Sequence, residues 1–166
     1  MSGSLIKIAS ASTSSNVSTI DIGGSSWDNS YNVYVVHIYN LKQSATDEVR
    51  LQARILKSDN SADSTANYDY ASEGLRTGST FDFLADSNQT AWSNLTYLFK
   101  GNTSYGASAT FHLFQFNDAN EHNQITLEGV GYGYDGSETM GAVGGAVHTV
   151  NQVAKGLQFS LSTGSI

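Results

Sequence analysis

The sequence has no cysteine and no proline in its 166 residues. Without cysteine there is no disulfide, no thiolate metal site and no cysteine nucleophile, so stability has to come from packing or from assembly. Without proline, turns have to be made by the 16 glycines and by the Asn, Asp and Ser clusters that border the apolar runs. This composition favours many short strands.

Charge is also scarce, because Asp, Glu, Lys and Arg make up 14% of the chain where about a quarter is usual. The 8 Lys and Arg residues are scattered and the net charge is −7, which argues against a nucleic-acid groove or an anionic membrane as partner. No apolar run has the length of a membrane span, and the start, MSGSLIKIASAS, lacks the basic and apolar regions of a signal peptide. We therefore expect no export by the usual route.

The clearest strand pattern lies in Asp47–Lys57, DEVRLQARILK. Val49, Leu51, Ala53 and Ile55 alternate with polar residues at a period of two, which is typical of a strand with one buried and one wet face. We predict that these four side chains are buried.

Two more apolar runs, Tyr31–Asn40 and Ser108–Phe116, are predicted to run with this strand and to form the core with it. Phe111 and Leu113 of the second run belong among the predicted buried residues. The run Ile125–Tyr132 follows a turn region and is expected to pair with the second run.

No segment has a persuasive helical period. The connection Ser58–Thr80 is long and polar and is expected to lie outward as functional or variable surface. Further β-type runs are Leu5–Ser10, Val17–Ile22, a weak one at Tyr68–Ser72, Phe81–Leu84, Leu95–Phe99, the glycine-rich Met140–Val150, and Leu157–Leu161. We predict one all-β domain over residues 1–166, a jelly-roll-like antiparallel sandwich of two sheets with about nine or ten strands.

The histidines do not form a metal motif, since His37, His112, His122 and His148 are dispersed and no two stand at the spacing of an HxH or HxxxH pair. The first two lie inside apolar strands, where a hydrogen-bonded structural histidine is the favoured interpretation. No Gly-x-Ser-x-Gly sequence frames a serine nucleophile. We therefore predict no catalytic residues, no cofactor and no enzyme activity.

Acidic clusters offer weaker alternatives. A glycosidase-like pair such as Glu48 with Glu128 cannot be identified from one sequence. Two loops supply oxygen ligands suited to calcium but lack its full spaced pattern, so turn chemistry is favoured and no metal is predicted. Their residues are Asp59, Asn60 and Asp63, and Asp118, Asn120 and Glu121. The run 129–136, GVGYGYDG, resembles a phosphate loop only superficially and is interpreted as a closely packed strand.

Aromatic residues near predicted loops suggest a second function class, a carbohydrate-binding module whose rings stack on sugars. The candidate glycan or partner contacts are Trp27, Tyr68, Tyr70, Trp92 and Tyr105. For Trp27, a loop tryptophan, the alternative interpretation that it closes the end of the sandwich is favoured over ligand binding. A glycan-degrading enzyme is the third hypothesis.

Several blocks together resemble a family of small virion proteins encoded by tailed phages of marine bacteria. They are IKIASASTSSNVSTIDI, a loop with an aromatic residue, YNVYVVHIYNLKQSATDEVRLQARIL, GNTSYGASATFHLFQF and GLQFSLSTGSI. The family pattern has a step ending in Ala-Thr-Asp between two core strands, here Tyr39–Asp47, and a closing step, here Leu157–Ile166.

The resemblance implies a jelly-roll-like sandwich on the particle exterior, as a capsid decoration (cement) protein or a tail fibre or receptor-binding component, with no catalytic residues. The expected partners are further copies of the chain in a trimer, a major capsid or tail protein, and a host surface glycan. The expected location is the virion, assembled in the bacterial cytoplasm.

Family members continue past the closing step into one more strand, whereas this chain ends at Ile166. We therefore expect an open sheet edge beside Leu157–Leu161. Either residues 1–11, with their run Leu5–Ser10, fold back over this edge, or they leave it to a strand from another protein and act as a docking arm.

Overall fold

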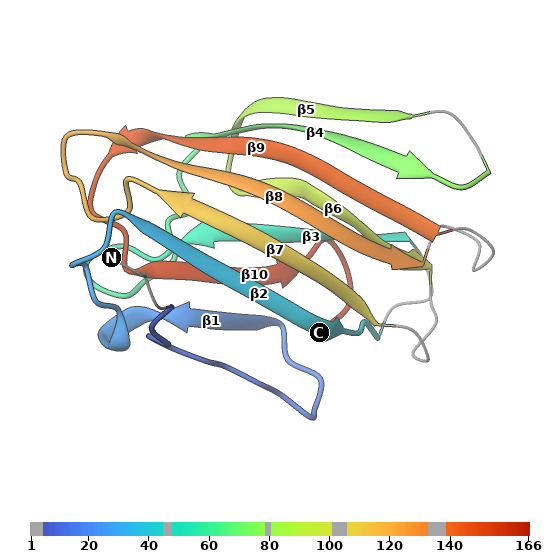
Figure 1. The fold of residues 1–166 in the computed structure, drawn as a ribbon, viewed down its shortest axis with the longest axis horizontal. Coiled ribbons are helices and arrows are strands. Elements are labelled where there is room, and N and C mark those ends of the chain that lie inside the picture. The colour runs from blue at the N-terminus through green and yellow to red at the C-terminus, as the bar shows by residue number, and fades with distance from the viewer. Residues whose placement is uncertain (1–4, 45–47, 79–80, 101–105, 133–138) are drawn as a thin grey trace.

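The computed structural model describes residues 5–44, 48–78, 81–100, 106–132 and 139–166, and it is an antiparallel β-sandwich (Figure 1). This confirms the predicted fold class and the predicted number of strands. The strands are β1 (Thr19–Gly23), β2 (Val33–Leu41), β3 (Glu48–Ile55), β4 (Tyr68–Arg76), β5 (Asp82–Gln89), β6 (Trp92–Lys100), β7 (Ala107–Phe114), β8 (His122–Tyr132), β9 (Thr139–Asn151) and β10 (Gly156–Leu161). One 3₁₀ turn, η1 (Gly24–Ser26), follows β1.

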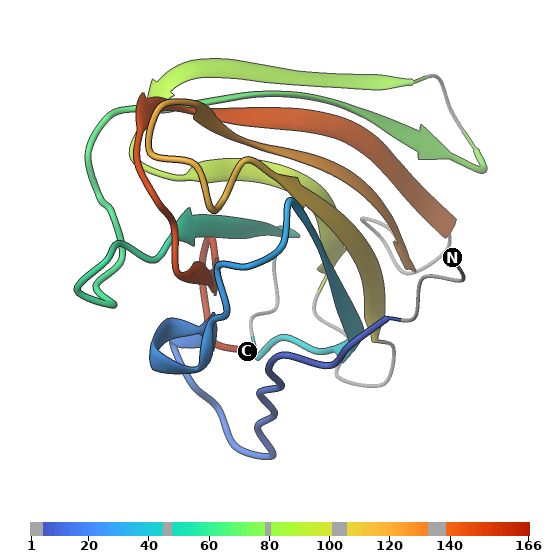
Figure 2. The same cartoon turned by 60° about the vertical axis from the view of Figure 1, so that its left-hand side comes forward.

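The two layers differ in width. One sheet has four strands in the order β1-β10-β3-β6, and the other has six in the order β2-β7-β8-β9-β4-β5. In Figure 2 the wider sheet curves over the narrower one, with the β4–β5 hairpin at its outer margin. Strand β5 therefore receives little cover from the second layer, and most of its residues are exposed.

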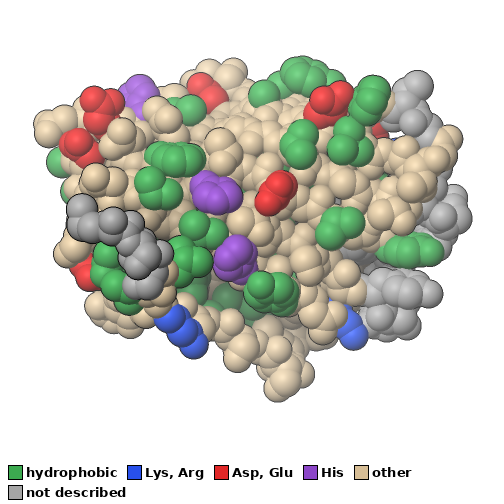
Figure 3. Space-filling view, viewed as in Figure 1, with side chains coloured by type: hydrophobic (Ala, Val, Ile, Leu, Met, Phe, Trp, Pro, Cys, Tyr) green, Lys and Arg blue, Asp and Glu red, His purple; other side chains and the backbone are tan. Residues whose placement is uncertain are grey.

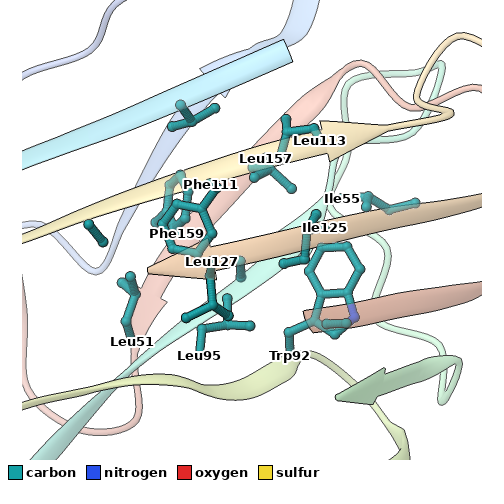
Figure 4. Close-up of a cluster of buried hydrophobic side chains, with 14 of the residues drawn as sticks. Leu51, Ile55, Trp92, Leu95, Phe111, Leu113, Ile125, Leu127, Leu157 and Phe159 are labelled. Atoms are coloured by element: carbon teal, nitrogen blue, oxygen red, sulfur yellow. The ribbon is translucent and has the colours of Figure 1, made fainter. Parts of the chain in front are cut away.

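The core lies between the two sheets, and the predicted buried residues are in it. Val49, Leu51, Ala53 and Ile55 of β3 are all at most 1% exposed, and Phe111 and Leu113 of β7 are fully buried. Figure 4 shows side chains of β3 and β10 facing those of β7 and β8. The alternation of apolar residues was therefore a sound guide to which face is buried.

Sheet membership differs from the prediction. Strand β3 pairs with β10 and β6, whereas β2 and β7 pair with each other in the opposite sheet. Strand β3 therefore lies in the layer opposite β2 and β7 and not beside them. A period of two identifies the buried face of a strand, but it does not say which strand lies beside it.

In the polar connection 58–80, the weak run predicted at Tyr68–Ser72 is the start of the nine-residue strand β4, which lies between β9 and β5, so this part of the connection belongs to the sheet and not to an outward loop. Ser72 and Gly74 of this strand face inward opposite Gly144 and Ala142. A Cβ atom on Gly144 would lie 2.6 Å from the carbonyl oxygen of Ala71. The strand looks polar in sequence because close packing at this position requires small residues.

The predicted open edge beside β10 is wrong. Strand β10 lies between β3 and β1, and β1 comes from the run 17–22 and not from Leu5–Ser10. The C-terminus is also held, because Val17 and Ile166 exchange two backbone hydrogen bonds of 3.0 and 2.9 Å. Leu5 is 87% exposed and Ile6 is 63% exposed, whereas Ile8 packs against the core, and the run Leu5–Ser10 is not the strand that pairs with β10.

Candidate functional site

The aromatic residues predicted to bind glycans are mainly core residues. Trp27, Tyr68, Tyr70 and Trp92 are all buried. The Trp27 ring packs 4.3 Å from the Tyr34 ring, which fits the alternative interpretation that it closes the sandwich. None of these four rings presents a face to a surface ligand.

The remaining candidate, Tyr105, lies outside the described residues. The buried Trp92 illustrates why the prediction failed, since its Nε1 donates a 3.0 Å hydrogen bond to the carbonyl oxygen of Val147 across the core. A tryptophan next to a loop can satisfy its polar atom internally. A glycan site therefore requires other residues.

The outer face of the six-stranded sheet is the broadest exposed surface that the strands form (Figure 3). It combines apolar, acidic and histidine side chains, and basic side chains appear only toward the lower rim of this view. Within the six strands of this sheet, Arg76 is the sole Lys or Arg. Arg76 stands in an inward-facing register opposite Met140 and forms an ion pair with Asp82. The face therefore suits neutral or cationic ligands better than anions.

A hollow of about 310 Å³ opens on this face over strands β2, β7 and β8. The strand register explains its shape. Its floor is the row Ile38, Ala109 and Gly129, whose side chains point inward or are absent, so that backbone is exposed. One wall is the row His37, Thr110 and Glu128, and the other wall contains Tyr39, Ser108 and Val130. We call this concavity the β2–β8 hollow.

Both walls of the β2–β8 hollow carry groups that are available to a ligand. The Tyr39 side chain is 77% exposed, and its ring lies 6.1 Å from that of His37. His37 Nδ1 is 3.2 Å from the Thr110 hydroxyl, which fixes the imidazole and leaves Nε2 without a partner in the described part of the chain. The Glu128 carboxylate makes no hydrogen bond or ion pair with the described residues.

The predicted role of two histidines is thereby corrected. His37 and His112 were expected to be structural residues inside apolar strands, but both belong to the outward-facing series of β2 and β7. The buried histidine is instead His148 on β9. The apolar residues around His37 face the core at every second position, and this alternation is the signal that places the histidine outside.

A second concentration of exposed groups lies at the opposite edge of the same sheet. Strand β5 and its neighbours expose large apolar side chains there, which we call the β5 patch: Leu75, Phe81, Phe83 and Val143. Phe83 is 77% exposed and Phe81 is 70% exposed. The register places Phe83 opposite Glu73, which in turn is opposite Val143, so the patch continues inward from the edge.

One buried polar cluster lies beneath the outer face, where the loop before β4 meets β9. Nε2 of His148 lies 3.3 Å from Oδ2 of Asp63. The same carboxylate accepts hydrogen bonds from the backbone and hydroxyl of Thr65, at 2.9 and 2.6 Å, and from the amide of Gln152, at 3.1 Å. The hydroxyl of Tyr68 completes the cluster by donating a 2.8 Å hydrogen bond to the backbone oxygen of Asp63.

The protonation states in this cluster follow from its environment. Burial lowers the pKa of His148, and the attraction of Asp63 does not fully offset this effect. Burial opposes ionisation of Asp63. The hydrogen bonds that Asp63 accepts from Thr65 and Gln152, together with the attraction of the nearby His148, outweigh the effect of burial, so the pKa of Asp63 is lowered. Burial also raises the pKa of Tyr68. The pair at neutral pH is therefore an ionised Asp63 beside a neutral His148.

The arrangement does not bring the other suspected catalytic or metal residues together. Glu48 begins β3 in the four-stranded sheet, whereas Glu128 lies on the outer face of the other sheet. Asp59 and Asp118 accept hydrogen bonds from backbone amides two residues later, at 2.9 and 2.8 Å, which is turn chemistry. Across the described ranges, no three His, Asp or Glu side chains gather closely enough to hold a metal ion.

Comparison with known proteins found no matching family model, no matching curated protein and no matching solved structure. Within the described residues, no helix has the length and apolar character needed to cross a membrane.

Proposed function

We propose that the protein is a non-enzymatic structural protein on the exterior of a tailed-phage particle, most simply a capsid decoration or cement protein. A tail fibre or receptor-binding component is the alternative location. The observation that supports an assembly role is the β5 patch, in which large apolar side chains stand exposed on an edge strand. The phage assignment itself rests on the resemblance of the sequence blocks.

The β5 patch has the properties of a protein contact. An edge strand offers unpaired backbone groups, and exposed apolar side chains beside it favour pairing with another chain. Burying a phenylalanine such as Phe83 contributes about 1.5–3 kcal/mol. The sparse charge of the whole chain reduces the desolvation cost of covering the surrounding surface.

A second exposed apolar surface, in the N-terminal segment, supports a contact between copies of the chain. Leu5 and Ile6 are exposed in the N-terminal segment, and this segment (dark blue) lies apart from the β4–β5 hairpin (green) in both ribbon views (Figures 1 and 2). Two different patches that bind each other between copies form a head-to-tail contact, which closes into a ring when the rotation fits. We propose a trimer of this kind, seated on a capsid or tail protein.

The direct test of the function is mass spectrometry of purified virus particles from the source of the sequence. The protein should be present at a fixed ratio to the major capsid or tail protein after the particles are washed in salt. Its absence from purified particles, together with its presence in the lysate from which they were prepared, would contradict the proposal.

We predict that Phe83→Ser weakens assembly without unfolding the chain. The side chain is exposed in the single chain, so its loss should leave the melting temperature within about 2 °C of the parent. Light scattering and co-sedimentation with particles should both show reduced assembly. Removing residues 1–7 should have the same effect, since Leu5 and Ile6 would be lost while Ile8, which packs against the core, and β1 are kept.

The matched control is Tyr39→Ser, because Tyr39 has the same exposed fraction as Phe83, 77%, but lies on the opposite edge strand. This variant should assemble as the parent does. Equal assembly by the Phe83 and Tyr39 variants would show that the β5 patch is not the contact.

A further inference from the structure

We propose that the β2–β8 hollow binds a saccharide. This inference goes beyond the assembly role, since it assigns a small-molecule site to a different part of the same face. The hollow has a volume of about 310 Å³, which is at the lower end of the range for ligand sites. Its floor of exposed backbone between two side-chain walls accepts a compact, flat ligand.

The chemistry of the two walls matches a sugar ring. One face of a pyranose is a sheet of C–H groups, which packs on an exposed aromatic ring, and Tyr39 presents such a ring at the margin of the hollow. The hydroxyl groups of the sugar need acceptors and donors in one plane. The Glu128 carboxylate can accept from two neighbouring hydroxyls, and the imidazole of His37 and the hydroxyl of Ser108 lie in the same lining.

The unused hydrogen-bonding groups distinguish this hollow from ordinary strand surface. Glu128 has no partner among the described residues, and His37 is oriented by Thr110 with its second ring nitrogen unpaired there. Because the imidazole on β2 is already oriented and the carboxylate on β8, beyond β7, is unpaired, a ligand that contacts both loses little conformational freedom in the protein. Neighbouring basic groups, which would neutralise Glu128, are missing from the described strands of this face.

Other ligand classes fit less well. A metal ion needs at least three ligands in reach, and no such group gathers in the described residues. A basic peptide would require several carboxylates along its length, but Glu128 is the only carboxylate that lines the hollow. A phosphate-bearing ligand would meet that carboxylate without any cation to offset it.

The location allows saccharide binding and assembly at the same time. The hollow lies over β2, β7 and β8, whereas Phe81 and Phe83 of the β5 patch are at the far edge of the six-stranded sheet, and only the innermost patch residue, Val143, is a cross-strand neighbour of Glu128. At the usual spacing of about 4.8 Å between strands, the two edge strands are roughly 24 Å apart. Failure of one proposal therefore leaves the other intact.

The test is a titration of the full chain with defined saccharides, in which binding is measured by isothermal calorimetry or ligand-observed NMR. The probes are the neutral trisaccharides cellotriose and maltotriose and the neutral N-acetylated chitotriose. At least one should bind, and both Tyr39→Ala and Glu128→Gln should weaken that binding about tenfold or more. Both changes are on exposed side chains, so thermal melting should be that of the parent.

Matched controls are available on the same face. Phe83→Ala removes a ring of equal exposure, and Glu73→Gln removes a carboxylate from the same cross-strand row as Glu128. Neither should change saccharide affinity. The proposal is overturned if no probe binds, if the control variants weaken binding as much as the site variants, or if oligolysine binds and the saccharides do not.

Discussion

Replacing Leu51 by aspartate is expected to destabilise the fold by at least about 3 kcal/mol, and to prevent folding altogether if the parent is only marginally stable. The Leu51 side chain is 1% exposed and lies in the packed cluster between the sheets (Figure 4). The substitution removes its apolar contacts and places a carboxylate where no cation or donor has been provided. Chemical denaturation followed by tryptophan fluorescence measures the change, since Trp92 is in the same cluster.

The neighbouring residue gives the matched control. Gln52 stands on the other face of the same strand and is partly exposed. Gln52→Asp introduces the same carboxylate one residue away and should cost less than about 1 kcal/mol. Equal losses in the two variants would show that the assigned register of β3 is wrong, since a one-residue slip exchanges the two faces.

The part of the fold that the sequence predicts well is the part in which residue type and burial agree. Along β3 and β7, apolar and polar residues alternate, except at Phe114 at the end of β7, and the structure buries the alternating apolar set in both strands. The predicted pairing of the run Ile125–Tyr132 with β7 is likewise present as the β7–β8 ladder. A short connection and two matching alternations were enough to fix that hairpin.

The pairing of strands that are distant in the sequence is much harder to predict from the sequence. Strand β1 lies beside β10 from the other end of the chain, with Thr19 opposite Ser160. Nothing in a two-residue period identifies a partner so distant in sequence. Strand β9 has 13 residues and extends the predicted glycine-rich run Met140–Val150 by one residue at each end. Its glycines permit close approach to β4.

The candidate site was mispredicted for a related reason. Large aromatic residues were taken as surface contacts because of their polar sequence neighbours, but Tyr68 and Trp92 fill the core. The exposed ring, Tyr39, stands in an apolar run that suggests full burial. The walls of the β2–β8 hollow come from three strands, and only their relative register brings His37 and Glu128 to the same row.

The buried Asp63–His148 pair leads to the second large expected effect. Asp63→Ala should cost about 2 kcal/mol at neutral pH, because it removes a buried carboxylate that accepts part-buried hydrogen bonds from Thr65 and Gln152 and lies against the fully buried His148. The loop before β4 also loses one of its contacts with β9, while the hydrogen bond from the Thr149 amide to the Asn67 carbonyl oxygen remains. The matched control is Asp59→Ala, which removes an exposed turn carboxylate of the same loop and should cost much less.

The same pair should make the fold sensitive to mild acid. The pKa of folded His148 is lowered from its ordinary value of 6.5, first by burial, so the unfolded chain takes up a proton there at a pH where the folded chain does not. The free energy of unfolding should therefore begin to fall as the pH drops below about 6.5. A second loss is expected below about 3.8, where the lowered pKa of Asp63 keeps that carboxylate ionised only in the folded chain.

The His148→Gln variant isolates the first of these two losses. Glutamine keeps an amide donor near Asp63 but does not titrate, so the slope of unfolding free energy between pH 6.5 and 5 should become shallower even if the variant is less stable overall. The groups around the ring that also carry charge or titrate are Asp63, Tyr68 and the more distant His122. His122→Gln is the matched control, because His122 is exposed, and it should leave the slope unchanged. Urea denaturation at a series of pH values measures the slope, and an identical slope in the His148 variant and the parent would show that this buried ring is not the acid-sensitive group.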